Sequence, residues 1–228
     1  MFFYDNYYLI FVLPAILISH FAQMKVKSTF NKYSQVMAHS SRTASEVTRC
    51  ILDMNGLQNV RIEQISGSLS DHFDPKSNVI RLSDSVRGVP SVAAIGVAAH
   101  EAGHAIQYKC GYMPIKLRNT ILPIANLGSQ LSVPLIIFGI LFSFEPLVSA
   151  GILLFSAVLL FQVITLPVEF NASKRAIATL SENNILVGEE LDGAKKVLSA
   201  AALTYVAAVL VSAMQLLRLL LISRRRNR

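Results

Sequence analysis

Residues 91–107 read Ser-Val-Ala-Ala-Ile-Gly-Val-Ala-Ala-His-Glu-Ala-Gly-His-Ala-Ile-Gln, and the fold around them follows from this stretch. A proline just before it and a glycine shortly after it predict one alanine-rich helix, from Ser91 to about Lys109. The helix contains a His-Glu-x-x-His pattern, with its two histidines four residues apart. That spacing has a direct chemical meaning.

His100 and His104 project from one face of the helix, because four residues advance a helix by about 400°. Two neutral imidazoles on one face are suited to hold Zn²⁺. Glu101 is rotated by about 100° from His100, so it lies beside the ion and can accept a proton from the water that attacks a polarised carbonyl. The pattern therefore predicts a catalytic site with one Zn²⁺ per chain.

A catalytic zinc site usually has three protein ligands, so a third must come from elsewhere in the chain. Glu169 is the first carboxylate after a pair of apolar segments, which would return the chain to the side of His104. Alternatively, Glu169 only caps a helix N-terminus. His72 is a second candidate, as a ligand or substrate contact. Four further acidic residues stand among polar neighbours, as on a solvated face: Glu182, Glu189, Glu190 and Asp192.

Membrane segments explain the composition, which is 53% hydrophobic and only 15% charged, against about 25% charged in ordinary soluble domains. Arg218 is the single charged residue within four apolar stretches, which are 8–24, 121–144, 147–168 and 199–222. The last stretch would either span or pack within the protein. We therefore expect a mostly helical α+β protein, with a water-facing part embedded in a bundle of three to four transmembrane helices.

The expected organisation has five parts. They are an N-terminal transmembrane anchor (1–24), a soluble part (25–118), a transmembrane hairpin (119–168), a helical segment with the third ligand (169–198), and a C-terminal apolar helix with a basic tail (199–228).

The soluble part has signals for a short helix and three strands. Thr43 and Glu46 form a capping box, residues 60–65 alternate as a strand, and turn residues after Asp74 predict a hairpin of 67–73 with 78–83. One hypothesis is that strand 78–83 lies antiparallel to an extended substrate, so that the backbone near Asn78 and Ile80 binds it. The alternative is an interior strand with no free edge.

Charge and cysteine content exclude other classes. The net charge of +7 is not arranged as a basic face with aromatics, so we expect no nucleic-acid partner. Two cysteines are too few for a disulfide framework. By the positive-inside rule, lysines and arginines near the segment ends predict a cytoplasmic active site; the arginine tail (224–226 and 228) conflicts with this if all four stretches cross.

Three motifs in order resemble the YugP-type bacterial membrane zinc metallopeptidases: 69–75 (Leu-Ser-Asp-His-Phe-Asp-Pro), 91–107, and 166–173 (Leu-Pro-Val-Glu-Phe-Asn-Ala-Ser). The resemblance covers nearly the whole chain. It implies a zincin-like fold, location in the bacterial inner membrane, and His100, Glu101, His104 and Glu169 as the residues of a site with one Zn²⁺.

A more distant resemblance is to the HtpX-type membrane proteases. Those enzymes commonly have an Asp four residues after the glutamate ligand, where it supports a histidine. This chain has Ser173 at that position, with Asn171 nearby, so the residue that supports the histidine differs.

Peptide-bond hydrolysis is the predicted reaction, with membrane or membrane-associated proteins as substrates because the site is next to the bilayer. Two alternatives remain open at this point. The same residues would serve a zinc hydrolase of a lipid-linked substrate, or a non-catalytic scaffold stabilised by zinc.

Overall fold

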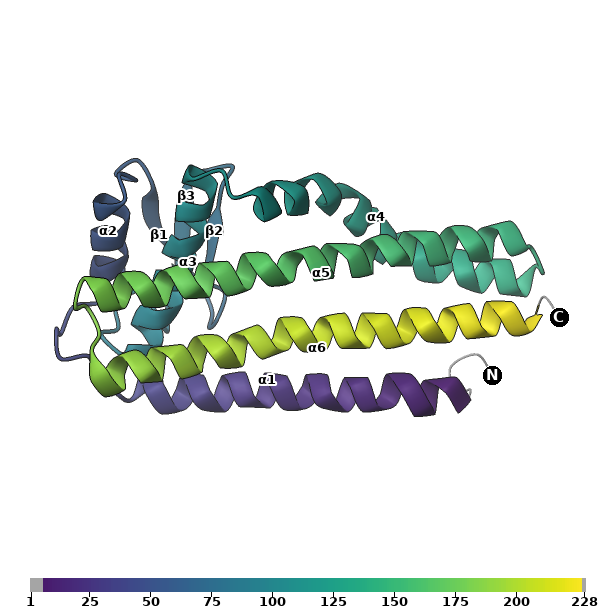
Figure 1. Cartoon of the computed structure of the whole chain (residues 1–228), viewed down its shortest axis with the longest axis horizontal. Coiled ribbons are helices and arrows are strands. Elements are labelled where there is room, and N and C mark those ends of the chain that lie inside the picture. Colours follow the sequence, from purple (N-terminus) through teal and green to yellow (C-terminus); the bar gives the residue numbers. More distant parts are fainter. Residues whose placement is uncertain (1–5, 227–228) are drawn as a thin grey trace. The chain divides into compact units, whose positions relative to one another are not determined.

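The computed structural model describes residues 6–226, which form two compact units (Figure 1). The helical unit comprises Met1–Ala22, Met113–Pro167 and Leu203–Arg228. The sheet unit comprises Gln23–Tyr112 and Val168–Ala202. The chain is mostly helical with one small sheet, as expected from the sequence.

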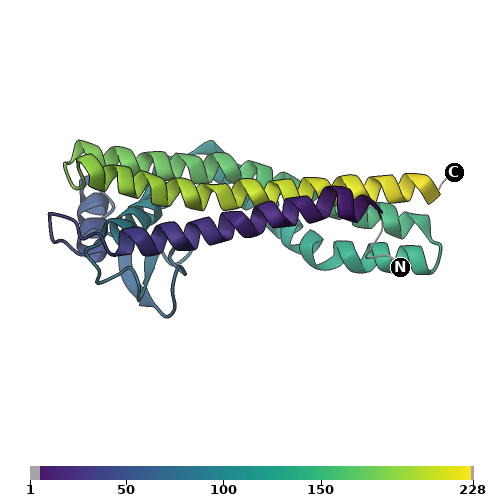
Figure 2. The ribbon, with the colours of Figure 1, turned by 90° about the horizontal axis from the view of Figure 1, so that it is seen from below.

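Four helices are long and apolar enough to cross a membrane. They are α1 (Leu13–Ser34, preceded by the π-helical turn η1, Tyr8–Val12), α4 (Met113–Leu141), α5 (Glu145–Glu182) and α6 (Gly188–Arg226). Helices α1 and α6 run side by side in both ribbon views (Figures 1 and 2). Residues 169–198 and 199–228 are not separate elements, because α5 and α6 continue through the expected boundaries.

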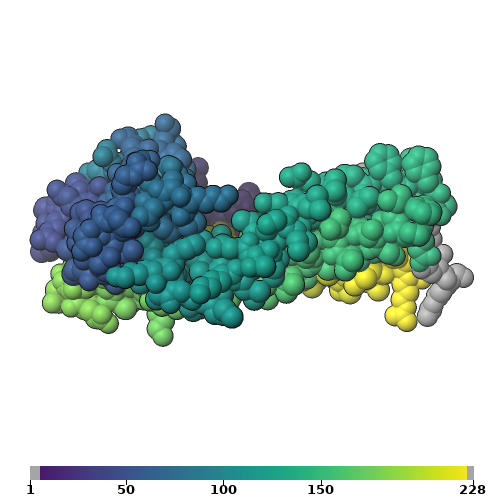
Figure 3. All heavy atoms as spheres, turned by 90° about the horizontal axis from the view of Figure 1, so that it is seen from above, coloured from purple at the N-terminus to yellow at the C-terminus, as the bar shows by residue number. Residues whose placement is uncertain are grey.

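Within the helical unit, α4 and α5 form a tight hairpin. Glycines permit this approach: a Cβ on Gly128 would lie 2.5 Å from the Leu154 carbonyl oxygen, and one on Gly139 would lie 2.7 Å from the Val148 nitrogen. The atoms of α4 (teal) and of the following part of α5 (green) lie side by side in Figure 3. Bulky apolar side chains, including Phe138 at 52% exposed, remain on the outer surface. Such a surface is suited to contact lipid.

The sheet unit is built on α3 (Val92–Lys109), which contains the His-Glu-x-x-His pattern. The Ser91 side chain caps its first turn by accepting a hydrogen bond from the Ala94 backbone N–H. Most of its alanines are buried, so neighbouring elements approach the helix closely. Helix α2 (Ala44–Met54) packs in the same hydrophobic core and begins with the predicted capping box of Thr43 and Glu46.

The three strands have the order β1-β3-β2. Strand β1 (Arg61–Ile65) is parallel to β3 (Val79–Ser83), and β2 (His72–Asp74) is antiparallel to β3 in the predicted hairpin. The prediction that strand 78–83 has a free edge for substrate is wrong, because β3 is central and both of its edges are paired. Instead, β2 is an edge strand of this sheet.

Within the sheet unit, helix α3 lies against α5 and α6. An added Cβ on Gly103 would lie 2.6 Å from the Ala172 carbonyl oxygen on α5, closer than side chains tolerate. An added Cβ on Gly96 would lie 3.4 Å from the Ala194 Cβ on α6, which is an ordinary contact. The absence of a side chain at Gly103 therefore brings α5 close to the histidines of α3.

Candidate metal centre

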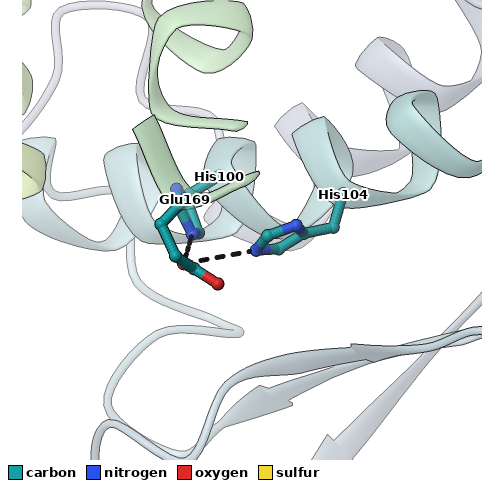
Figure 4. A group of neighbouring side chains, drawn as sticks. All are labelled: His100, His104 and Glu169. Atoms are coloured by element: carbon teal, nitrogen blue, oxygen red, sulfur yellow. Dashed lines mark ion pairs between the residues drawn. The ribbon is translucent and has the colours of Figure 1, made fainter. Parts of the chain in front are cut away.

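The structure brings together the three predicted ligands. The Nε2 atoms of His100 and His104 lie 3.3 Å and 3.6 Å from one oxygen, Oε2, of Glu169 (Figure 4). One ligand atom from each residue lies within 4.8 Å of the other two. Two imidazoles come from one face of α3, and the carboxylate comes from α5.

The donor set fits a zinc ion. Two neutral imidazoles and one carboxylate are a recurrent ligand set of catalytic zinc, which leaves a fourth position open. Glu169 is only 4% exposed, so its carboxylate is enclosed with the two rings. Burial alone would lower the pKa of His104, but the carboxylates of Glu169 and Glu101 reverse this and raise it. The negative charge of these two carboxylates therefore favours a cation at this site.

Glu101 lies apart from the three ligands, as the helical spacing predicts. Its side chain is 8% exposed, and its Oε2 accepts a hydrogen bond from the Phe73 backbone N–H at 3.0 Å. Phe73 pairs with Ile80 of β3, but its N–H points away from β3 toward α3. The candidate base is therefore held by the outer edge of β2.

Each histidine has a partner on its other ring nitrogen. His100 Nδ1 lies 3.1 Å from the Ser173 hydroxyl, and His104 Nδ1 lies 3.0 Å from Gln107 Oε1. Ser173 was among the predicted contacts, but Gln107 was not. Its signal was available, since it follows His104 by three residues and shares a face of the helix with it.

Asn171 is connected to the candidate ligand His104 through Gln107. Its Oδ1 accepts hydrogen bonds from Gln107 Nε2 at 3.0 Å and from Arg175 Nε at 2.8 Å. Asn171 therefore contacts the residue that supports His104 rather than a ligand itself.

Three other predicted contacts lie outside the cluster. His72 turns to the opposite face of the sheet from Phe73, which packs on Tyr108 of α3, and its nitrogens lie near Ser70 O and Arg81 Nη1. Asn78 is in the turn before β3, where its side chain donates to the Asn59 carbonyl. Ile80 is fully buried. The side chains of His72, Asn78 and Ile80 therefore contact other residues of the sheet, its turns and its core, and not the three candidate ligands.

Comparison of the sequence with known proteins identifies the family of the chain. Residues 8–224 match the model of a family described as "putative neutral zinc metallopeptidase". The chain belongs to this zinc metallopeptidase family. It is 47% identical over 215 residues to "Putative membrane protease YugP" of Bacillus subtilis (strain 168), an alignment that covers 94% of this chain and 96% of that protein.

No solved structure matches the chain. With four membrane-length helices and a relative named a membrane protease, the chain is a membrane protein.

Proposed function

We propose that this protein is a membrane-integrated zinc endopeptidase with a zincin-like site. The observation that carries the proposal is the convergence of His100, His104 and Glu169 beside a separate buried carboxylate, Glu101. Three ligands alone would suit a structural ion as well. The second acidic group, Glu101, lies close by but outside the ligand set, and it is the feature that hydrolysis requires.

The chain's own groups carry out the proton transfers. A zinc ion held by the three ligands would supply Lewis acidity, which polarises the scissile carbonyl and lowers the pKa of water. Glu101 accepts the proton of the attacking water as its oxygen bonds to the carbonyl carbon. Glu101 then gives that proton to the departing nitrogen as the C–N bond breaks. One water is consumed, and its second proton passes from the new carboxyl group to the amine, so that a carboxylate and a protonated amine are released.

The edge of β2 is where we place an extended substrate. Since β3 is paired on both sides, β2 is the strand whose outer edge faces the helix of the site. A peptide that lies along this edge would be next to Glu101, to which the Phe73 N–H of β2 donates. Because Glu169 follows the apolar run of α5 directly, we propose membrane or membrane-associated proteins as substrates and a site on the cytoplasmic face of the bacterial inner membrane.

The test is the Glu101→Gln variant of purified protein in lipid nanodiscs, incubated with a membrane-protein extract. We expect bound zinc to be unchanged and the appearance of new N-termini to fall by about 10²–10⁴-fold, as for loss of a general base. Glu182→Gln is the matched control, because Glu182 is an exposed carboxylate at the end of α5.

Equal rates for Glu101→Gln and wild type would refute the proposed base. Zinc-dependent turnover of lipid-linked compounds, without new N-termini, would instead favour a hydrolase of non-peptide substrates.

A further inference from the structure

The Gln107 side chain connects the metal centre to α5. It is fully buried on α3 and uses both ends of its amide. Its Nε2 donates to the Val168 carbonyl at 2.8 Å and to Asn171 Oδ1 at 3.0 Å, while its Oε1 lies 3.0 Å from His104 Nδ1. All of these groups belong to the sheet unit.

The direction of this amide is determined by its partners. A backbone carbonyl only accepts hydrogen bonds, so the Gln107 atom that faces Val168 must be the nitrogen. The same nitrogen donates its second proton to Asn171. The amide oxygen of Gln107 is therefore directed at His104, and it can only accept.

Arg175 determines the direction of the second amide. A guanidinium has donors and no acceptor, so the Asn171 atom that faces Arg175 Nε at 2.8 Å must be the oxygen. If Asn171 were turned over, its NH₂ group would oppose donors of both Arg175 and Gln107. The Arg175 guanidinium is itself held by Cys110, whose sulfur accepts from Nη2 at 3.5 Å.

We propose that Gln107 and Arg175 are positioning residues that fix the tautomer of His104. The donors and acceptors between Arg175 and His104 allow one direction only, which places the proton on Nδ1. In the neutral ring, His104 Nε2 is then the nitrogen without a proton, and it faces Glu169 Oε2, where a cation would bind. This inference rests on the proposed function only for the identity of that cation.

His100 lacks such a device among the contacts that the structure describes. Its Nδ1 lies against the Ser173 hydroxyl, which can either donate or accept. The two histidines of the motif thus differ in the partner of Nδ1: an oxygen that only accepts for His104, and a hydroxyl that can do either for His100.

Two readouts test the proposal on the full-length protein in detergent micelles. The first is the ¹⁵N NMR spectrum of the His104 ring in metal-free protein, recorded at a pH above which the ring shifts no longer change, so that the ring is neutral. The second is zinc affinity by competition with a chelator. The variants are Gln107→Leu, which removes the acceptor, and Arg175→Met, which removes the donor at the far end.

Two controls isolate the effect of the donor. Arg175→Lys keeps a side chain that only donates, and Lys174→Met removes a neighbouring exposed cation from the same helix.

We expect the Nδ1–H tautomer in wild type, Lys174→Met and Arg175→Lys. Gln107→Leu should populate the Nε2–H tautomer and bind zinc about 10–100-fold more weakly, and Arg175→Met should shift both readouts less in the same direction. Arg175→Met keeps the test decisive if Gln107→Leu does not fold.

An Nε2–H tautomer in wild type would overturn the proposal. An unchanged tautomer in both variants would also overturn it, even if zinc affinity fell, because the role would then be structural. The NMR readout needs neither zinc nor substrate, so a failure of the proposed peptidase function would be seen separately, in turnover.

Discussion

Glu169 is the residue on which the candidate metal centre depends most, because it alone comes from α5. One of its carboxylate oxygens, Oε2, faces both His100 and His104. Without it, two imidazoles on one helix turn would hold an ion by themselves, one short of the usual protein ligand set of a catalytic zinc.

Replacing Glu169 by Ala should weaken zinc binding by more than the roughly 10–100-fold that follows loss of an outer partner. Atomic absorption of dialysed protein, with chelator competition, measures this directly. Glu182→Ala is the control on the same helix, and its zinc content should equal that of wild type. Full zinc affinity in Glu169→Ala would remove this residue from the centre.

The four candidate site residues were predicted from the sequence by two different kinds of argument. His100, Glu101 and His104 are related by helix geometry alone, so their spacing was sufficient. Glu169 required an argument about chain direction through a hairpin. The role of Gln107 depends on which atoms of α5 lie opposite it, and one sequence does not contain that information.

At the scale of elements, the approach of α3 to α5 brings the ligands together. Gly103 lies between the two histidines in sequence and packs directly on the backbone of Ala172, three residues after Glu169. A methyl group at this point would force the two helices apart or distort one of them.

Gly103→Ala should destabilise the protein by about 1–3 kcal/mol and weaken zinc binding, because it overfills a backbone contact. Gly96→Ala is the matched control on the same helix, where the new Cβ meets Ala194 at an ordinary distance. Its stability should stay within about 1 kcal/mol of wild type or rise, since alanine favours helix. Thermal unfolding in detergent and chelator competition give both quantities. Equal losses in the two variants would contradict this account.

The β2–β3 turn depends on one carboxylate. The Ser77 hydroxyl, the Lys76 backbone N–H and the Arg81 guanidinium all donate to Asp74 and hold its pKa well below the usual range. A depressed pKa means that the ionised form stabilises the fold. That contribution is fully present above the unfolded pKa of about 4 and is lost as the pH falls toward the folded value.

We therefore expect Asp74→Ala to lower the melting temperature at pH 7, with a difference from wild type that narrows at about pH 3. Both proteins should be measured with excess chelator, so that loss of metal does not contribute. A difference independent of pH would show that the Asp74 charge does not stabilise the turn.

Individual helices and strands were easier to predict from the sequence than the pairing of the strands. The helix from Ser91, the capping box at Thr43 and the 60–65 strand follow from local patterns, and the structure has all three. Which strand is central is decided by long-range pairing between β1 and β3, which alternation of side chains does not encode. Hence the antiparallel pairing of the hairpin was predicted correctly, but its first strand begins at His72 and not at residue 67, and the free edge was assigned to the wrong strand.

At the scale of the whole molecule, each long helix has one end in the sheet unit or directly adjoining it in sequence. If all four cross the bilayer, chain continuity puts the α4–α5 turn and the end of α6 on the side opposite the candidate metal centre. The arginine tail then lies on that side, against the positive-inside tendency of the other basic residues.

Thiol labelling tests this topology in intact cells with a membrane-impermeant maleimide. In a Cys50→Ser background, exposed Cys110 reports the side of the sheet unit, and Ser143→Cys, with Cys110 also replaced, reports the α4–α5 turn. We expect Cys110 to be protected and Ser143→Cys to be labelled. Labelling of both, or protection of both, would contradict four crossings or this orientation.

Pro167 lies inside α5 at the boundary between the two units, two residues before Glu169. Proline lacks an N–H and weakens the helix where it stands, so bending costs less there than elsewhere along the helix. Bilayers differ in thickness, and a span adjusts to them by changing its tilt. A bend at Pro167 would take up that adjustment before it reached Glu169, so the arrangement of the three candidate ligands would be kept in membranes of different lipid composition.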